Sequence, residues 1–429
     1  MADLTSKFAG ITSPNPFWLA SAPPTNTGEQ IMRAFDAGWG GAVWKTIGTP
    51  IINVTSRFGS IDHDRSKVIG FNNIELISDR PTEVNFKEIY EVKKRYPQHA
   101  VIASLMVETR EEWRDMIKRS VDAGADGLEL NFGCPHGMCE RGMGSAVGAE
   151  PAVCEDITSW VVQESSIPVI IKLTPNITDI NDPAEAAVRG GAHALSLINT
   201  IKSIIGVDLE TATPRPVVDG RSTNGGYCGP AVRPIALHMV AQLGRNPLIN
   251  VPISGIGGIA TWRDALEFIM LGATNVQVCT AVMHYGYRIV EDMIEGTLNF
   301  MREHNYATID DMVGLAVPKF TDWGELNMNY ELVAKIDDKS CIGCQLCYTA
   351  CMDAAHQCIH LREDTRVPFV DEHECIGCNL CQIVCPVPGC ITMSPVDNGK
   401  PRMSWGEYQE AIARGERVTV GKHTSQTAF

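Results

Sequence analysis

The chain has 429 residues, of which 44% are hydrophobic and 20% are charged, and its formal net charge is −15. This length exceeds that of one ordinary domain, so we expect one large domain and one smaller domain. The negative charge argues against a nucleic-acid-binding surface, because such a surface needs a basic patch. The sequence shows neither a secretory signal nor an apolar run of membrane-spanning length, which predicts a cytoplasmic protein.

The first 310 residues repeat one pattern, in which a helix-like segment meets a glycine and then a short apolar run, as in "VDAGADGLELN" and "VRGGAHALSLIN". Glycine is favoured just after a helix, and a continuous apolar run is typical of a parallel strand buried on both faces. Eight such strands are predicted to begin at about Phe17, Ala42, Val101, Gly127, Pro168, Ala194, Pro252 and Asn275. This alternation predicts a (β/α)₈ TIM barrel over residues 1–310.

A doubly wound sheet is the alternative fold, but it would normally show an early Gly-x-Gly-x-x-Gly turn. The only similar string, "GIGGIA" at residues 255–260, follows the seventh strand. TIM barrels often bind phosphate in the loops after strands seven and eight, so the string suits a phosphate site there.

Polar residues end several of the predicted strands. Active sites of TIM barrels lie at the C-terminal ends of the strands, so these residues are expected to meet at one rim. Any one of them alone could simply cap a strand. The residues concerned are Lys45, Thr46, Asn131, Cys134, Lys172, Asn199 and Thr200.

Ten of the fifteen cysteines lie between residues 341 and 390, where the spacing C-x₂-C-x₂-C-x₃-C occurs twice. This is the two-cluster ferredoxin pattern, in which the fourth cysteine of each run ligates the other cluster. One 4Fe–4S cluster is expected on Cys341, Cys344, Cys347 and Cys385, and the other on Cys351, Cys375, Cys378 and Cys381. Structural zinc is the alternative, but it does not explain the third and fourth cysteines of each run.

The doubled pattern predicts a small α+β ferredoxin-like domain over residues 331–395, after a linker at 311–330 and before a tail at 396–429. Cys358 and Cys390 lie outside the pattern and are expected to be small buried residues. Because iron–sulfur clusters pass single electrons, a flavin in the barrel is the expected exchange partner.

The chain resembles the dihydropyrimidine dehydrogenase family in the strings "LASAPPT", "FNNIELIS", "LELNFGCPHGMCERGMG", "IKLTPN", "GGYCGPAVRPIAL" and "SGIGGI", together with the doubled cysteine run. The resemblance implies reversible reduction of uracil or thymine to the 5,6-dihydropyrimidine. The barrel alone also suits dihydroorotate dehydrogenase, and an electron-transfer subunit without catalysis is a further alternative.

The resemblance also implies roles for individual residues. Cys134 would be the general acid, and the loop at 135–148 would close over the site. The family motif has serine before this cysteine, where Gly133 stands here. The implied pyrimidine-binding residues are Asn73, Asn131, Phe132, Gly133, Asn199 and Thr200. The implied FMN-binding residues are Ala20, Ser21, Lys45, Thr46, Lys172, Gly226, Gly257, Gly258, Cys279 and Thr280.

The last expectation concerns the source of the electrons. The sequence has no convincing dinucleotide-binding fingerprint, yet the resemblance implies electrons from NAD(P)H. A separate iron–sulfur flavoprotein subunit of the PreT type, carrying FAD, is therefore expected as the partner in a heterotetramer.

Overall fold

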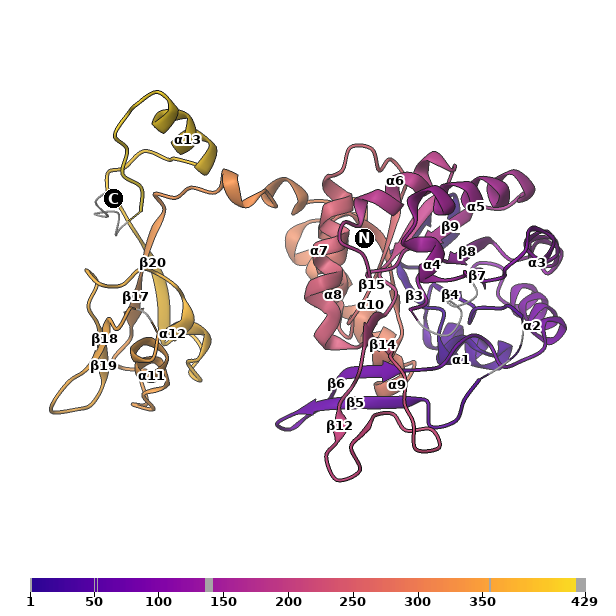
Figure 1. Ribbon diagram of the computed structural model, residues 1–429, viewed down its shortest axis with the longest axis horizontal. Coiled ribbons are helices and arrows are strands. Elements are labelled where there is room, and N and C mark those ends of the chain that lie inside the picture. The colour runs from indigo at the N-terminus through magenta and orange to yellow at the C-terminus, as the bar shows by residue number, and fades with distance from the viewer. Residues whose placement is uncertain (1, 50, 52, 136–141, 355, 422–429) are drawn as a thin grey trace. The chain divides into compact units, whose positions relative to one another are not determined.

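The computed structural model of the chain describes residues 2–49, 51, 53–135, 142–354 and 356–421 (Figure 1). The chain divides between Phe320 and Thr321 into two compact units. The first unit contains a closed parallel barrel of eight strands, which confirms the predicted (β/α)₈ fold. Among the described residues, no helix has both the length and the apolar character needed to cross a membrane.

Each barrel strand pairs in parallel with its neighbours along the chain, and the last strand returns to the first. All eight begin within two residues of their predicted starts. The strands are β3 (Phe17–Leu19), β4 (Gly41–Val43), β7 (Ala100–Leu105), β8 (Gly127–Asn131), β9 (Val169–Lys172), β10 (Ala194–Leu197), β15 (Ile253–Ile256) and β16 (Ala273–Val278).

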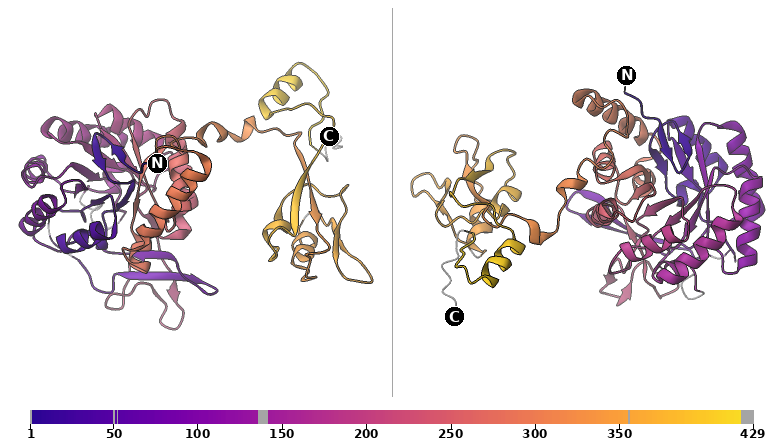
Figure 2. Two further views of the ribbon diagram at one scale, coloured as in Figure 1. Left: turned by 180° about the vertical axis from the view of Figure 1, so that it is seen from behind. Right: turned by 90° about the horizontal axis from the view of Figure 1, so that it is seen from above.

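Helices surround the barrel strands (Figure 2). Threonines begin several of them, because a threonine oxygen can accept a hydrogen bond from an otherwise unpaired amide of the first turn. Thr109 and Thr261 do so in α3 and α8. The main helices are α1 (Gly28–Ala37), α2 (Thr82–Arg95), α3 (Arg110–Asp122), α5 (Pro151–Glu164), α6 (Asn181–Arg189), α7 (Arg233–Arg245), α8 (Trp262–Met270) and α10 (Ile289–His304). Two shorter helices are α4 (Ser145–Gly148) and α9 (Thr280–Tyr285).

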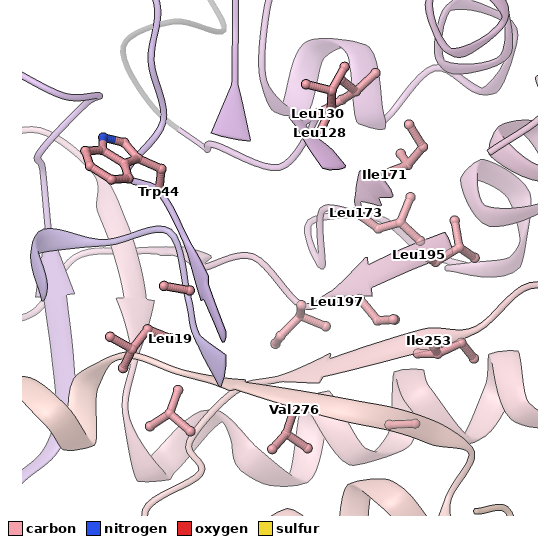
Figure 3. Close-up of a cluster of buried hydrophobic side chains, with 14 of the residues drawn as sticks. Leu19, Trp44, Leu128, Leu130, Ile171, Leu173, Leu195, Leu197, Ile253 and Val276 are labelled. Atoms are coloured by element: carbon pink, nitrogen blue, oxygen red, sulfur yellow. The ribbon is translucent and has the colours of Figure 1, made fainter. Parts of the chain in front are cut away.

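The largest hydrophobic cluster of the first unit is formed by side chains from the barrel strands and the surrounding helices. Close-packed burial of this kind contributes most of the stabilisation of a fold. Figure 3 labels ten of these side chains: Leu19, Trp44, Leu128, Leu130, Ile171, Leu173, Leu195, Leu197, Ile253 and Val276.

A hairpin of β1 (Ser6–Phe8) and β2 (Ile11–Ser13) closes the N-terminal end of the barrel. Phe8 packs edge-on against Trp18 with 5.5 Å between ring centroids, and the Trp18 Nε1–H donates to Ser13 Oγ at 3.0 Å. Val43, Ala100, Ile102, Ile170 and Ala194 complete this apolar layer. The C-terminal end is therefore the one available for a site.

Two long insertions, which follow β4 and β10, pair with each other at that end. They supply a four-stranded antiparallel sheet in the order β11-β14-β6-β5. Its strands are β5 (Phe58–His63), β6 (Ser66–Asn73), β11 (Ile201–Ser203) and β14 (Gly225–Cys228). A small ribbon of β12 (Val207–Asp208) and β13 (Thr213–Pro214) extends from the second insertion.

The second unit consists of two similar halves. β17 (Glu331–Ile336) pairs with β20 (Ile391–Val396), and β18 (Ile359–Leu361) pairs with β19 (Pro368–Val370), both antiparallel. The helices α11 (Leu346–Met352) and α12 (Leu380–Ile383) each follow a left-handed residue, Gln345 and Asn379. After β20 the chain folds back and continues into α13 (Trp405–Ala413). A hydrogen bond from the side-chain amide of Asn329 to Pro401 O, at 2.8 Å, joins this segment to the residues that precede β17.

Replacing Leu195 with alanine should destabilise the barrel by about 2–5 kcal/mol, because it removes a fully buried side chain and leaves a cavity. Leu209, which is 88% exposed, provides the matched control, and Leu209→Ala should change stability by less than about 0.5 kcal/mol. Urea unfolding followed by tryptophan fluorescence measures both. Equal effects of the two substitutions would contradict this assignment of the core.

Candidate functional site

A cavity lies at the C-terminal end of the barrel strands. It brings together residues from seven strand ends and from the inserted sheet, and 14 of them were predicted from the sequence. The predicted residues that line it are Ala20, Ser21, Lys45, Thr46, Asn73, Asn131, Cys134, Lys172, Asn199, Thr200, Gly257, Gly258, Cys279 and Thr280.

Asn131, at the end of β8, is the centre of a hydrogen-bonded group of side chains. Its amide nitrogen donates to Thr46 Oγ1 at 3.1 Å, and its oxygen accepts from Asn199 Nδ2 at 2.9 Å. Thr46 is in turn bonded to the hydroxyls of Ser21 and Ser104. These bonds join the ends of five strands, so the orientation of each amide at the floor of the cavity is held by its neighbours.

A buried charge pair lies beneath the cavity. The Lys172 ammonium is 3.4 Å from Glu129 Oε1, and Glu129 is completely buried. The other carboxylate oxygen of Glu129 accepts from Ser196 Oγ at 3.0 Å and from Gln277 Nε2 at 3.2 Å. These polar side chains lie above the apolar layer of the barrel. The pair therefore holds a cation at the cavity with its countercharge placed below it.

Gln277 also lines the cavity, and its Oε1 atom is buried without a hydrogen-bond partner among the described residues. A buried polar atom without a partner is costly in a folded protein, so such an atom on a cavity wall indicates a bound polar group. The isoalloxazine of a flavin offers such groups. The residues of this wall therefore fit the flavin that the sequence predicts.

A second buried ammonium group, that of Lys45, lies 2.7 Å from Glu75 Oε1. The same oxygen accepts from Arg57 at 2.8 Å, and Arg57 also contacts Asp79 at 3.2 Å. Two cations and two carboxylates thus alternate in this group, of which Lys45 and Glu75 line the cavity. Each lysine of the cavity is therefore paired with its own carboxylate.

Cys134 is buried at the start of the loop that follows β8, where it packs with Ile77, Met106 and Met143. Its carbonyl accepts the Ser145 amide at 3.0 Å, so the described ends of the loop meet beside it. Residues 136–141 of the predicted lid, including Cys139, lie outside the described residues. Gly144 has φ +60°, and a Cβ there would lie 2.8 Å from Cys134 O, which requires glycine.

The part of the cavity formed by the turn after β15 suits a phosphate. Gly257 and Gly258 adopt left-handed φ values of +136° and +72°, so their backbone turns sharply where the seventh strand ends. Burial raises the pKa of the nearby Cys228 thiol to about 11, and it raises the pKa of Cys279 well above its ordinary value. Both thiols therefore stay neutral at physiological pH and add no negative charge beside a bound anion.

Three predicted residues do not line the cavity. Phe132 packs into the hydrophobic core of the barrel. A Cβ on Gly133 would lie 2.4 Å from Asn199 Cβ, and one on Gly226 would lie 2.1 Å from Thr200 Oγ1. The absence of a side chain at these two glycines therefore allows Asn199 to pack against the backbone of Gly133 and Thr200 to pack against the backbone of Gly226. A serine at position 133 would require Asn199 to move.

Three other residues of the site were not singled out from the sequence: Glu75, Glu129 and Gln277. Each is a polar residue inside an otherwise apolar run, in "NIELIS", "GLELN" and "NVQVCT". A polar or charged side chain in a buried apolar run needs a polar partner, and this requirement could have marked the three residues as members of a site. The partner of Glu129 could not be identified from sequence spacing, because Glu129 and Lys172 lie on different, neighbouring strands.

The cysteines of the second unit surround two small cavities. Each is lined by three cysteines of one run and the fourth cysteine of the other, together with one further cysteine. One cavity holds Cys341, Cys344, Cys347 and Cys385, and the other holds Cys351, Cys375, Cys378 and Cys381. Every cysteine that the structure describes is free of disulfides. These thiols are therefore available as ligands, and four around each cavity is the number that a 4Fe–4S cluster takes.

Comparison with protein families gives two matches. The dihydroorotate dehydrogenase family matches residues 3–301, and the 4Fe-4S dicluster domain family matches residues 334–393. The first match covers the barrel and the second covers both cysteine runs. The second match decides between the two interpretations of the cysteine-rich unit in favour of iron–sulfur clusters over zinc.

Comparison with individual proteins gives relatives over most of the chain. The chain is 43% identical to the NAD-dependent dihydropyrimidine dehydrogenase subunit PreA of Escherichia coli, over 96% of this chain and 98% of that one. It is 43% identical to the chloroplastic dihydropyrimidine dehydrogenase (NADP(+)) of Arabidopsis thaliana, over 76% of this chain and 79% of that one. It is 34% identical to the catalytic subunit of dihydroorotate dehydrogenase B (NAD(+)) of Pyrococcus horikoshii, over 73% of this chain and 98% of that one.

Substituting Glu129 with glutamine should lower the free energy of unfolding of the barrel by about 3–5 kcal/mol, because it leaves the Lys172 charge buried without its countercharge. Urea unfolding measures the change. The exposed pair Arg189–Glu155 is the matched control, and Glu155→Gln should cost less than about 1 kcal/mol. A Glu129→Gln variant as stable as the wild type would show that the pair does not hold the lysine.

Proposed function

We propose that this chain, which belongs to the dihydropyrimidine dehydrogenase family, catalyses the reversible reduction of uracil or thymine to the 5,6-dihydropyrimidine. It is an iron–sulfur oxidoreductase whose cofactors are FMN and two 4Fe–4S clusters. The observation that carries the proposal is the placement of Cys134 in one cavity with the side-chain amides of Asn131 and Asn199 and the ammonium group of Lys172.

The barrel would hold FMN between its two polar walls. Lys172 and Gln277 would face the ring system, and the turn at Gly257 and Gly258 would hold the phosphate. When bound, FMN supplies the hydride that reduces C6 of the pyrimidine. The positive charge of Lys172 would stabilise negative charge on the reduced ring, and Glu129 keeps that ammonium group in place.

The pyrimidine would be bound by side-chain amides. A uracil ring alternates carbonyl acceptors with N–H donors, and an asparagine amide offers both complementary groups. The amide nitrogens of Asn73, Asn131 and Asn199 each make one hydrogen bond to another of the residues that the structure describes. Because an amide nitrogen carries two hydrogens, each keeps one N–H for the substrate.

Cys134 would complete the reaction as a general acid. Its thiol would donate a proton to C5 from the face opposite the hydride, and the S–H bond would break as the C5–H bond forms. An ordinary thiol, with a pKa of about 8.5, is mostly protonated at neutral pH and can act in this way. The buried position of Cys134 would help to keep competing water from the reacting carbon.

The charges of the cavity favour a neutral pyrimidine over dihydroorotate. An orotate carboxylate would need a cation to bind, and both lysines of the cavity already face carboxylates at 2.7 and 3.4 Å. In this proposal Lys172 also faces the reduced flavin, so neither lysine is left to pair with a substrate carboxylate. Uracil and thymine carry no such group.

The electrons would come from NAD(P)H through a separate subunit. The E. coli relative is named as a subunit and as NAD-dependent, and the plant relative as NADP(+)-dependent. In this proposal a partner flavoprotein with FAD and its own iron–sulfur clusters passes electrons to the two clusters here, and these reduce FMN. The second unit of the chain would be its docking and relay domain.

Replacing Cys134 with alanine should lower turnover with uracil by roughly 10²–10⁴-fold, because that is the usual contribution of a general acid. Flavin, iron and sulfide content should stay at the wild-type level. Anaerobic assays of the co-expressed complex with uracil, thymine and orotate measure the effect and the substrate preference together. An alanine variant with the wild-type rate, or a wild-type enzyme active on orotate alone, would refute the proposal.

The isolated chain should reduce uracil when a chemical donor reduces its clusters, but not with NADH alone. Addition of the partner subunit should restore the NADH-dependent rate, because that subunit supplies the nicotinamide site. Full activity of the isolated chain with NADH would contradict the role of the partner. Inactivity with the chemical donor would instead favour an electron-transfer subunit without catalysis.

A further inference from the structure

Each cluster cavity of the second unit contains five cysteines, one more than a 4Fe–4S cluster binds. The additional residues are Cys358 in one cavity and Cys390 in the other. Both were expected to be small buried residues rather than ligands. Both are buried, but neither is remote from the ligands.

Cys358 lies directly against the ligand set of its cavity. Its Sγ atom is 3.5 Å from Cys351 Sγ, and its backbone amide donates to the same sulfur at 3.3 Å. Cys375, a second ligand, lines the same cavity as Cys358. Only 4% of Cys358 is exposed, so it faces the cavity rather than solvent.

Cys390 repeats this arrangement in the other half of the unit. It immediately precedes β20, as Cys358 immediately precedes β18. Its thiol donates to Asp337 O at 3.8 Å, and it lines the same cavity as Cys385, the fourth cysteine of the second run, just as Cys351 is the fourth cysteine of the first. In both halves, therefore, the additional thiol shares its cavity with the one ligand that comes from the opposite run, and in the half of Cys358 the two sulfurs are in contact.

We propose that Cys358 is a reserve ligand of the cluster held by Cys351, Cys375, Cys378 and Cys381, interchangeable with Cys351. If the bond between iron and Cys351 is broken, the proton of the Cys358 thiol would pass to the released Cys351 thiolate 3.5 Å away, and the Cys358 thiolate would form a new iron–sulfur bond. The count of four thiolates is preserved, and no electron is transferred. This inference is independent of the pyrimidine chemistry.

The contacts explain why Cys351 is the ligand that can be replaced. Two sulfurs 3.5 Å apart can reach the same iron by a change of side-chain rotamer. No such neighbour is recorded for Cys378, which is exposed, within the described residues. Loss of Cys351 should thus be tolerated, whereas loss of Cys378 should not.

The test compares iron and sulfide content and the EPR spectra of the reduced clusters in anaerobically purified full-length chains. Cys351→Ala should keep about eight irons per chain and the signals of both clusters. Cys378→Ala, the matched control, should lose about four irons, and so should the double variant Cys351→Ala/Cys358→Ala. Cys358→Ala alone should keep about eight, because the four primary ligands remain.

Two results would overturn the proposal. One is a Cys351→Ala variant that loses as much iron as Cys378→Ala or fails to accumulate as folded protein. The other is a double variant that keeps the same iron as Cys351→Ala, since Cys358 would then not be the replacement. The EPR signal of the other cluster, present in every variant, shows that the second unit has folded in each case.

Discussion

The closed parallel barrel is the constraint on which the rest of the first unit depends. Its hydrogen-bonded register places Asn131 level with Lys172 and Lys172 level with Ser196, although these residues lie far apart in the sequence. Because all eight strands run in one direction, their polar ends meet at one rim. The apolar layer around Trp18 closes the other end, so the barrel has one open end and the chemistry is confined to it.

Two buried ion pairs determine the charge of the cavity at the open end of the barrel. The ion pair of Lys172 and Glu129 lies below the cavity, and that of Lys45 and Glu75 lies along its wall. Each lysine can thus present a positive charge to a bound group without leaving a net charge in the protein interior. Such a site suits a cofactor that gains electrons beside a substrate that stays neutral.

The sequence analysis predicted the barrel strands well, because a glycine and a following apolar run mark β4, β8, β10 and β16, and the other strands are apolar runs that alternate with helical patterns. It also identified Asn131, Lys172 and Asn199, which end those runs and line the cavity. It did not identify Glu129 or Gln277, since their partners lie on other strands. The inserted sheet was also beyond prediction, because β6 pairs with β14 about 150 residues later, a pairing that no local pattern encodes.

The stereochemistry of reduction in D₂O tests the central claim most directly, namely that the flavin and Cys134 act on opposite faces of the pyrimidine. Dihydrouracil formed by the co-expressed complex can be analysed by NMR through the coupling between its C5 and C6 hydrogens. We predict deuterium at C5 and C6 on opposite faces of the ring. Deuterium on the same face, or at C5 without facial preference, would contradict the placement of Cys134 as the proton donor.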